Sequence, residues 1–192
     1  MPASLWLNHS TDLLLLATEL AGAVVGSARW VRAGCASKLL TTYLWISVLL
    51  GVPGLVIAWR GHSNVWTVHL WILCAIVFLG QWVLIRSRAR CAKHLRPLLV
   101  CVLFGWFFCA FTLGILQDYT YLHLAMAVLG LSGMICSRHS SLADWGMIAA
   151  FASDVFLCAI TTYWHAEFPM FWAVRNVVWS MALALVVKGS HQ

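Results

Sequence analysis

Charge is scarce in this chain of 192 residues, where Asp, Glu, Lys and Arg together account for only 9% of the sequence. A soluble globular domain carries roughly 25% charged residues. Hydrophobic residues reach 62%, and one soluble core cannot bury so many of them, because small domains leave much of their surface exposed. The composition therefore excludes a soluble domain, a disordered segment and a nucleic-acid-binding protein. It predicts a membrane protein whose main partner is the lipid bilayer.

Motifs of catalysis and metal binding are also absent from the sequence. It contains no G-x-S-x-G, H-E-x-x-H or P-loop pattern, and its seven cysteines form no C-x-x-C pair and no zinc-type spacing. The stretch from His139 to Ser141, with Asp144, resembles parts of a catalytic triad. Capping of the next helix by Ser141 or Asp144 explains these residues better. We therefore expect no catalytic residues and no metal site, and the pattern favours a protein that is not an enzyme.

Seven apolar segments follow one another along the chain, each close to the roughly 20 residues that cross a bilayer as a helix. They cover residues 12–31, 39–59, 64–86, 97–117, 119–137, 144–164 and 168–188. The alternating ten-residue segments of a transmembrane barrel are absent. We predict an all-α polytopic membrane bundle of seven transmembrane helices, which forms one domain over residues 1–192. The segment 119–137 is the shortest, and without it the count falls to six.

The basic residues fall almost entirely on one side of this seven-helix arrangement. Ten of the twelve lie in the first, third and fifth loops and in the C-terminal tail: Arg29, Arg32, Lys38, Arg86, Arg88, Arg90, Lys93, Arg96, Arg138 and Lys188. The other side holds Arg60, and Arg175 lies inside the last segment. The positive-inside rule therefore predicts an N-terminus outside and a C-terminus in the cytoplasm. We expect the membrane to be a bacterial cytoplasmic (inner) membrane.

Two further patterns concern helix packing. Gly22 and Gly26 form a G-x-x-x-G motif, which allows a close backbone approach to a neighbouring helix. In addition, residues 20–26 resemble residues 124–130, and residues 66–69 resemble residues 172–175, with offsets of 104 and 106. This similarity suggests two parallel three-helix units joined by the fourth helix, an arrangement that occurs in some transporters.

The tryptophans fall into two groups. Eight of the twelve lie near segment ends, where anchoring at the membrane interface accounts for them: Trp6, Trp30, Trp59, Trp66, Trp82, Trp145, Trp164 and Trp172. Four lie deeper: Trp45, Trp71, Trp106 and Trp179. The deeper group either packs in the core or lines a cavity for a flat or lipophilic ligand.

Three charged residues lie inside the apolar segments, namely Glu19, Asp154 and Arg175. Each costs roughly 2.5–3.5 kcal/mol at the membrane centre, so each is expected to face the bundle interior or to meet a partner. At about 1.5 Å per residue, these three residues fall with His69 and His123 in one layer about 10 Å thick. We predict one cluster in the outer half of the bilayer around Arg175, whose guanidinium can bind a carboxylate with two parallel hydrogen bonds.

This cluster predicts binding or transport of a small molecule or ion through an outward-facing polar cavity. Arg175 would bind an anionic group, or Glu19 and Asp154 would bind a cation or a proton. A structural interpretation is that Arg175 pairs with Asp154 or Glu19 only to hold the helices in register. The alternative function is a non-catalytic accessory subunit, with membrane-protein partners or a homo-oligomer. In such a subunit His69 and His123 would ligate a b-type haem or a pigment.

Overall fold

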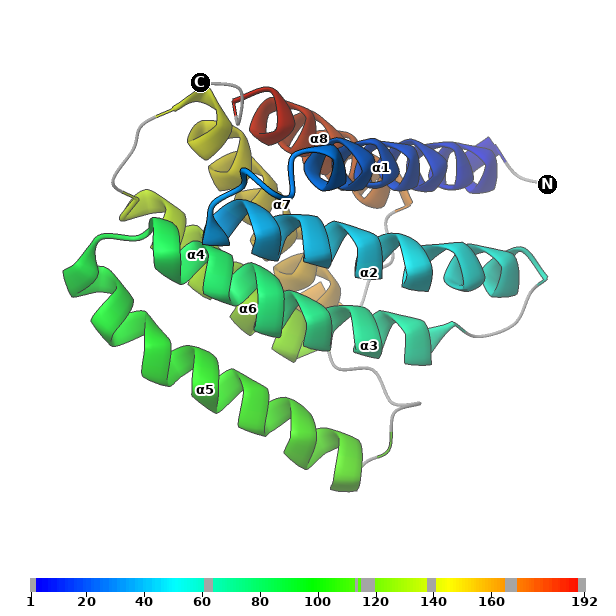
Figure 1. Cartoon of the computed structure of the whole chain (residues 1–192). Coiled ribbons are helices and arrows are strands. Elements are labelled where there is room, and N and C mark those ends of the chain that lie inside the picture. The colour runs from blue at the N-terminus through cyan, green and yellow to red at the C-terminus, as the bar shows by residue number, and fades with distance from the viewer. Residues whose placement is uncertain are drawn as a thin grey trace.

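The computed structural model describes residues 3–60, 64–112, 114, 120–137, 141–164 and 169–189. Within these ranges all regular structure is helical, apart from one isolated bridge between Ser87 and Ser137. The helices are α1 (Ala3–Ala28), α2 (Cys35–Trp59), α3 (Val65–Cys74), η1 (Ala75–Leu79), α4 (Gly80–Arg86), α5 (Ala89–Thr112), α6 (Thr120–Ile135), α7 (Leu142–Trp164) and α8 (Pro169–Gly189). The π-helical segment η1 joins α3 and α4 into one continuous rod (Figure 1). Each predicted segment overlaps one helical rod, which confirms the all-α bundle.

Two of the predicted segments begin more than two helical turns after the start of the helix in the structure. Helix α1 begins at Ala3 rather than at residue 12, and α5 begins at Ala89 rather than at residue 97. Three basic residues that were expected in the loop, Arg90, Lys93 and Arg96, therefore belong to α5, and Pro97 lies inside this helix. A helix can extend past its apolar part in this way because basic side chains at its end reach headgroups and water.

Six of the described helical rods are long and apolar enough to cross a membrane. They are His9–Ala28, Cys35–Trp59, Val65–Arg86, Ala89–Thr112, Leu142–Thr161 and Met170–Lys188. Helix α6 has 16 residues, which is fewer than the roughly 20 that a perpendicular crossing needs. The chain is therefore a multi-pass integral membrane protein, and α6 is the rod on which a seventh crossing depends.

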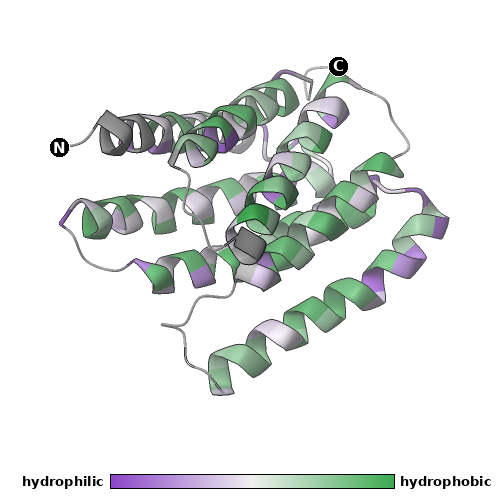
Figure 2. Cartoon of the chain, turned by 180° about the vertical axis from the view of Figure 1, so that it is seen from behind, coloured by the Kyte–Doolittle hydropathy of each residue, from purple (hydrophilic) through white to green (hydrophobic). Residues whose placement is uncertain are grey.

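The helical rods follow one another as neighbours in a closed order, with α5 outside it. Helix α1 packs against α2 and α8, α2 packs against the α3–α4 rod, α4 against α6, α6 against α7, and α7 against α8. Helix α5 packs mainly along α6 and the η1–α4 part of the rod, at the lower edge of both views (Figures 1 and 2). The predicted three-helix units correspond to α1, α2 and the α3–α4 rod, and to α6, α7 and α8. The last rod of each unit contacts the first rod of the other. Two parallel units joined by α5 would have this order of neighbours.

The G-x-x-x-G prediction is confirmed where α1 crosses its neighbours. A Cβ atom added at Gly26 would collide with the side chain of Thr41 on α2. A Cβ atom at Gly22 would press on Leu44 of α2 and Val187 of α8. The two glycines therefore allow α1 to lie close to both helices, as small residues do in membrane bundles.

The outer surface of the bundle is strongly apolar. On α5, Phe104, Phe108 and Phe111 expose 69%, 67% and 87% of their surface. Figure 2 shows hydrophobic residues along most of α5, with hydrophilic ones gathered at the end next to α4. Large exposed apolar areas are stable only when lipid or another protein covers them. This surface fits a chain whose outer helices face the bilayer.

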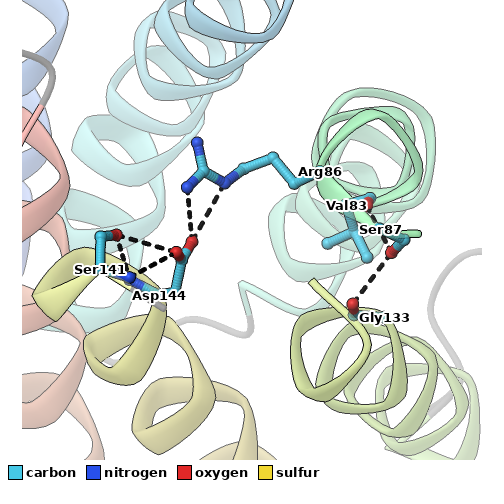
Figure 3. Close-up of polar contacts among 6 residues, drawn as sticks. All are labelled: Val83, Arg86, Ser87, Gly133, Ser141 and Asp144. Atoms are coloured by element: carbon cyan, nitrogen blue, oxygen red, sulfur yellow. Dashed lines mark hydrogen bonds and ion pairs between the residues drawn. The ribbon is translucent and has the colours of Figure 1, made fainter. Parts of the chain in front are cut away.

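The loops that carry most of the basic residues share one end of the bundle. The backbone N–H of Arg88, after α4, donates a hydrogen bond to the carbonyl of Cys136, after α6, at 2.9 Å. The Ser87 hydroxyl donates to the carbonyl of Gly133 at 2.9 Å (Figure 3). These bonds hold the α4–α5 link against the end of α6. The predicted cytoplasmic residue Arg138 lies outside the described residues.

Candidate functional site

A buried ion pair joins α7 and α8. The Nε atom of Arg175 lies 2.6 Å from Oδ1 of Asp154, and both residues are almost fully buried. The other carboxylate oxygen, Oδ2, lies 3.5 Å from Nε2 of His123 on α6. Charges removed from water are tolerated when they are paired in this way. The structure therefore brings together three of the five residues that the sequence placed in one layer.

Aromatic rings surround the guanidinium group of Arg175. Its Cζ atom lies 5.5 Å from the ring centroid of Trp71, 6.0 Å from Trp172 and 5.6 Å from Trp179. These distances suit cation–π interactions. The Nη1 atom donates a hydrogen bond to Oδ1 of Asn176 at 3.1 Å. Arg175 is thus held by a carboxylate, an amide and three aromatic faces before any ligand arrives.

Glu19 on α1 has a different environment from Asp154. It is 6% exposed, and its Oε1 atom accepts a hydrogen bond from the Ser47 hydroxyl of α2 at 2.8 Å. The Ser47 oxygen in turn accepts a hydrogen bond from Nε1 of Trp71 on α3 at 2.9 Å. Among the described residues, no Lys, Arg or His lies within ion-pair distance of Glu19. Glu19 is therefore a buried carboxylate whose direct partner is neutral.

Asp12 also belongs to this region, although it is not among the residues that the sequence predicted for the cluster. Its Oδ1 atom accepts a hydrogen bond of 2.6 Å from Nδ2 of Asn176, which ties α1 to α8. Asp12 lies seven residues, or about two helical turns, before Glu19, so both side chains share one face of α1. That spacing was the signal that could have identified Asp12. Ser47 carried no comparable signal, because a serine in an apolar segment is ordinary.

A pocket of about 290 Å³ opens between α1, α2, α3, α6 and α8. Its polar wall includes Asp12, Glu19, Ser47, Asn64, His123, Arg175 and Asn176, and its aromatic wall includes Trp71 and Trp172. Leucines and glycines of α1 and α2 form most of the remainder. Asp154 is not part of the wall, since it lies behind Arg175. Trp172, interpreted from the sequence as an interfacial anchor, thus also lines a cavity.

His69 does not join the pocket wall. It is buried on α3, and its backbone carbonyl accepts a hydrogen bond of 3.1 Å from Nε1 of Trp106 on α5. Trp71, two residues later on α3, lines the pocket, and positions two apart on a helix point about 200° away from each other. His69 and His123 therefore do not line the same pocket, although they share one predicted layer. The haem or pigment alternative requires both side chains to face one cavity.

The described residues contain no group of three or more His, Cys, Asp or Glu side chains that could hold a metal ion.

At the opposite end of the bundle, Ser141 and Asp144 cap α7 reciprocally, as predicted. The N–H of Asp144 donates to the Ser141 hydroxyl at 3.2 Å, and the N–H of Ser141 donates to Oδ2 of Asp144 at 3.0 Å (Figure 3). His139 and Ser140 lie outside the described residues.

Comparisons with known proteins give no relative from which a function could be inferred. No family model, no curated protein and no solved structure matches the chain. The arrangement of Glu19, Asp12 and Arg175 around the pocket therefore has to be interpreted from its chemistry.

Proposed function

We propose that this membrane protein binds a small cation in the pocket between α1, α2, α3, α6 and α8 and transports it across the bilayer. One observation carries the proposal. Glu19 and Asp12 line the pocket with the neutral partners Ser47 and Asn176, while Arg175 is already paired with Asp154. The negative charge of the two carboxylates in the wall is therefore larger than the positive charge that Arg175 has left to neutralise it.

The chemistry of the wall favours a cation over an anion. A buried carboxylate is costly unless it is neutralised, so Glu19 gains from taking up a cation or a proton from the pocket. An anion would have to compete with Asp154 for Arg175 while facing Glu19. The aromatic faces of Trp71 and Trp172 in the wall add attraction for an ammonium group.

The size of the pocket favours a small organic cation. Its volume of about 290 Å³ lies at the lower limit of ordinary ligand sites, which span roughly 300–1,000 Å³. An accessory subunit that only packs against other proteins needs no such pocket. The pocket lies at the end opposite the basic loops, so the predicted orientation opens it to the outer side of a bacterial cytoplasmic membrane.

Binding of tetramethylammonium to the purified full-length chain tests this proposal. We expect Glu19→Gln to weaken binding more than tenfold, because the substitution keeps the shape of the side chain and removes its charge. Glu19→Asp, the matched control, keeps the charge and should retain most of the affinity. Proteoliposome uptake of labelled tetramethylammonium should follow the same order. Equal affinity of the wild type and Glu19→Gln, with both variants folded, would contradict the proposal.

A further inference from the structure

The direct hydrogen-bond partner of Glu19 is a hydroxyl group, and this sets Glu19 apart from Asp154. The Ser47 hydroxyl donates a hydrogen bond of 2.8 Å to Oε1 of Glu19, whereas Asp154 faces the guanidinium of Arg175 at 2.6 Å. A guanidinium can only donate, so it has no lone pair for the O–H of a protonated carboxyl group. A hydroxyl has one donor and two lone pairs, so it can bond either form of a carboxyl group.

The hydrogen bonds of Ser47 leave room for both forms of Glu19. One lone pair of the Ser47 oxygen accepts the hydrogen bond of 2.9 Å from Nε1 of Trp71. While Glu19 is ionised, the Ser47 hydroxyl donates to it, as the structure shows. Once Glu19 is protonated, the Ser47 hydroxyl can rotate and accept the O–H of Glu19 with its second lone pair. The contact between α1 and α2 is therefore kept whether or not Glu19 carries a proton.

Other titratable and charged groups around Glu19 come from five helices. They are Asp12 of α1, Tyr43 of α2, His123 of α6, Asp154 of α7 and Arg175 of α8. Asp154 and Arg175 pair with each other, and a phenol such as that of Tyr43 ordinarily ionises only at about pH 10. The groups of this region that can exchange a proton near neutral pH are therefore Glu19, Asp12 and His123.

A proton and a cation compete for the carboxyl group of Glu19. The residue is 6% exposed, and a buried carboxylate is costly unless a positive charge accompanies it or a proton neutralises it. Protonation removes the charge that attracts a cation from the pocket. A bound cation in turn favours the ionised form and so expels the proton. Each of the two therefore displaces the other from Glu19.

We infer that the cation enters in exchange for a proton, so that the protein is a cation–proton antiporter; this inference rests on the proposed cation site. When the cation enters, the O–H bond of the Glu19 carboxyl group breaks and the proton passes to bulk water. The carboxylate then forms an ion pair with the ammonium group. Glu19 with its proton and Glu19 with its cation are both neutral, whereas the empty, ionised form is costly in the bilayer. This cost couples the movements of the two ions.

Proton release on binding of tetramethylammonium tests the exchange, measured with a pH indicator on the purified full-length chain in weakly buffered detergent. Where Glu19 is protonated, we expect release of about one proton per cation and about tenfold weaker binding for each unit by which the pH is lowered. Glu19→Gln at saturating tetramethylammonium should release none, because an amide carries no acidic proton. Asp12→Asn is the matched variant. It removes the other carboxylate of the pocket wall and should still release the proton.

The outcomes separate the exchange from the cation site on which it rests. Binding without proton release between about pH 5 and pH 8 would overturn the exchange and leave the cation site in place. Release that persists in Glu19→Gln, or that disappears in Asp12→Asn, would assign the proton to another group and overturn the inference. Absence of tetramethylammonium binding would contradict the proposed function itself, and the exchange with it. In proteoliposomes, an acid interior should raise uptake by the wild type, and equal uptake without the pH difference would overturn the exchange.

Discussion

Two Arg–Asp pairs are anchored on α7, one near the middle of this helix and one at its start. In the first, Arg175 of α8 meets Asp154, with Nε 2.6 Å from Oδ1. In the second, Arg86 of α4 meets Asp144, with Nε 3.1 Å from Oδ1. The Arg175 side chain is 8% exposed, whereas the Arg86 side chain is 28% exposed. Both pairs fasten α7 to a neighbouring helix.

The cavities next to these pairs differ in the charged residues that line them. Each pair is neutral as a unit, so it contributes little net charge to the cavity beside it. Glu19 and Asp12 line the pocket beside Arg175, and Arg29 and Arg32 line the cavity beside the Arg86–Asp144 pair. The paired charges hold the helices together. In the pocket, the proposed preference for a cation follows from Glu19 and Asp12, whose direct hydrogen-bond partners are neutral.

Removal of Arg175 is expected to give the largest effect on stability. Arg175→Leu leaves Asp154 buried without its cation, and loss of one partner of a buried pair costs about 3–5 kcal/mol of unfolding free energy. Replacing both residues, as Arg175→Met with Asp154→Leu, should recover most of this loss because no unpaired charge remains. Unfolding in mixed detergent micelles measures both variants. A single variant as stable as the wild type would contradict the structural role of this pair.

Removal of Arg86 should cost less. Arg86→Leu leaves Asp144 with its two hydrogen bonds from Ser141, and the more exposed pair is better screened by water. We expect a loss of about 1 kcal/mol in unfolding free energy, as for partly exposed ion pairs. The same unfolding assay measures it. If Arg86→Leu destabilised the protein as much as Arg175→Leu, the two ion pairs would not differ in the way described.

The smallest effect is expected from Asp12, which is only half-buried. Asp12→Asn can still accept the hydrogen bond from Asn176, so only the charge is lost. We expect tetramethylammonium binding to weaken about threefold, and high salt to reduce this difference because it screens exposed charges. A loss as large as that of Glu19→Gln would show that Asp12, rather than Glu19, is the main cation-binding carboxylate.

Hydrophobic patterning predicted the fold because long apolar segments specify membrane helices directly. It did not predict where α5 begins, because this helix extends past its apolar part into the basic residues 89–96, where the apolar pattern stops. For the site, counting residues placed Glu19, Asp154, Arg175 and the two histidines in one layer, and the structure brings Asp154, Arg175 and His123 into contact. Depth says nothing of rotation about each helix axis, which is why Trp71 lines the pocket and His69 does not. The Arg86–Asp144 pair joins residues 58 positions apart, and no local pattern indicates such a contact.

The central claim is that Glu19 binds a cation in the pocket between α1, α2, α3, α6 and α8. A titration of tetramethylammonium on three proteins tests it most directly: the wild type, Glu19→Gln, and the control Arg88→Ala with Arg90→Ala, whose positions do not line the pocket. We predict that Glu19→Gln loses the cation and that the control binds it like the wild type. The account would be contradicted if Glu19→Gln bound the cation as tightly as the wild type, or if the control lost it equally, while remaining folded.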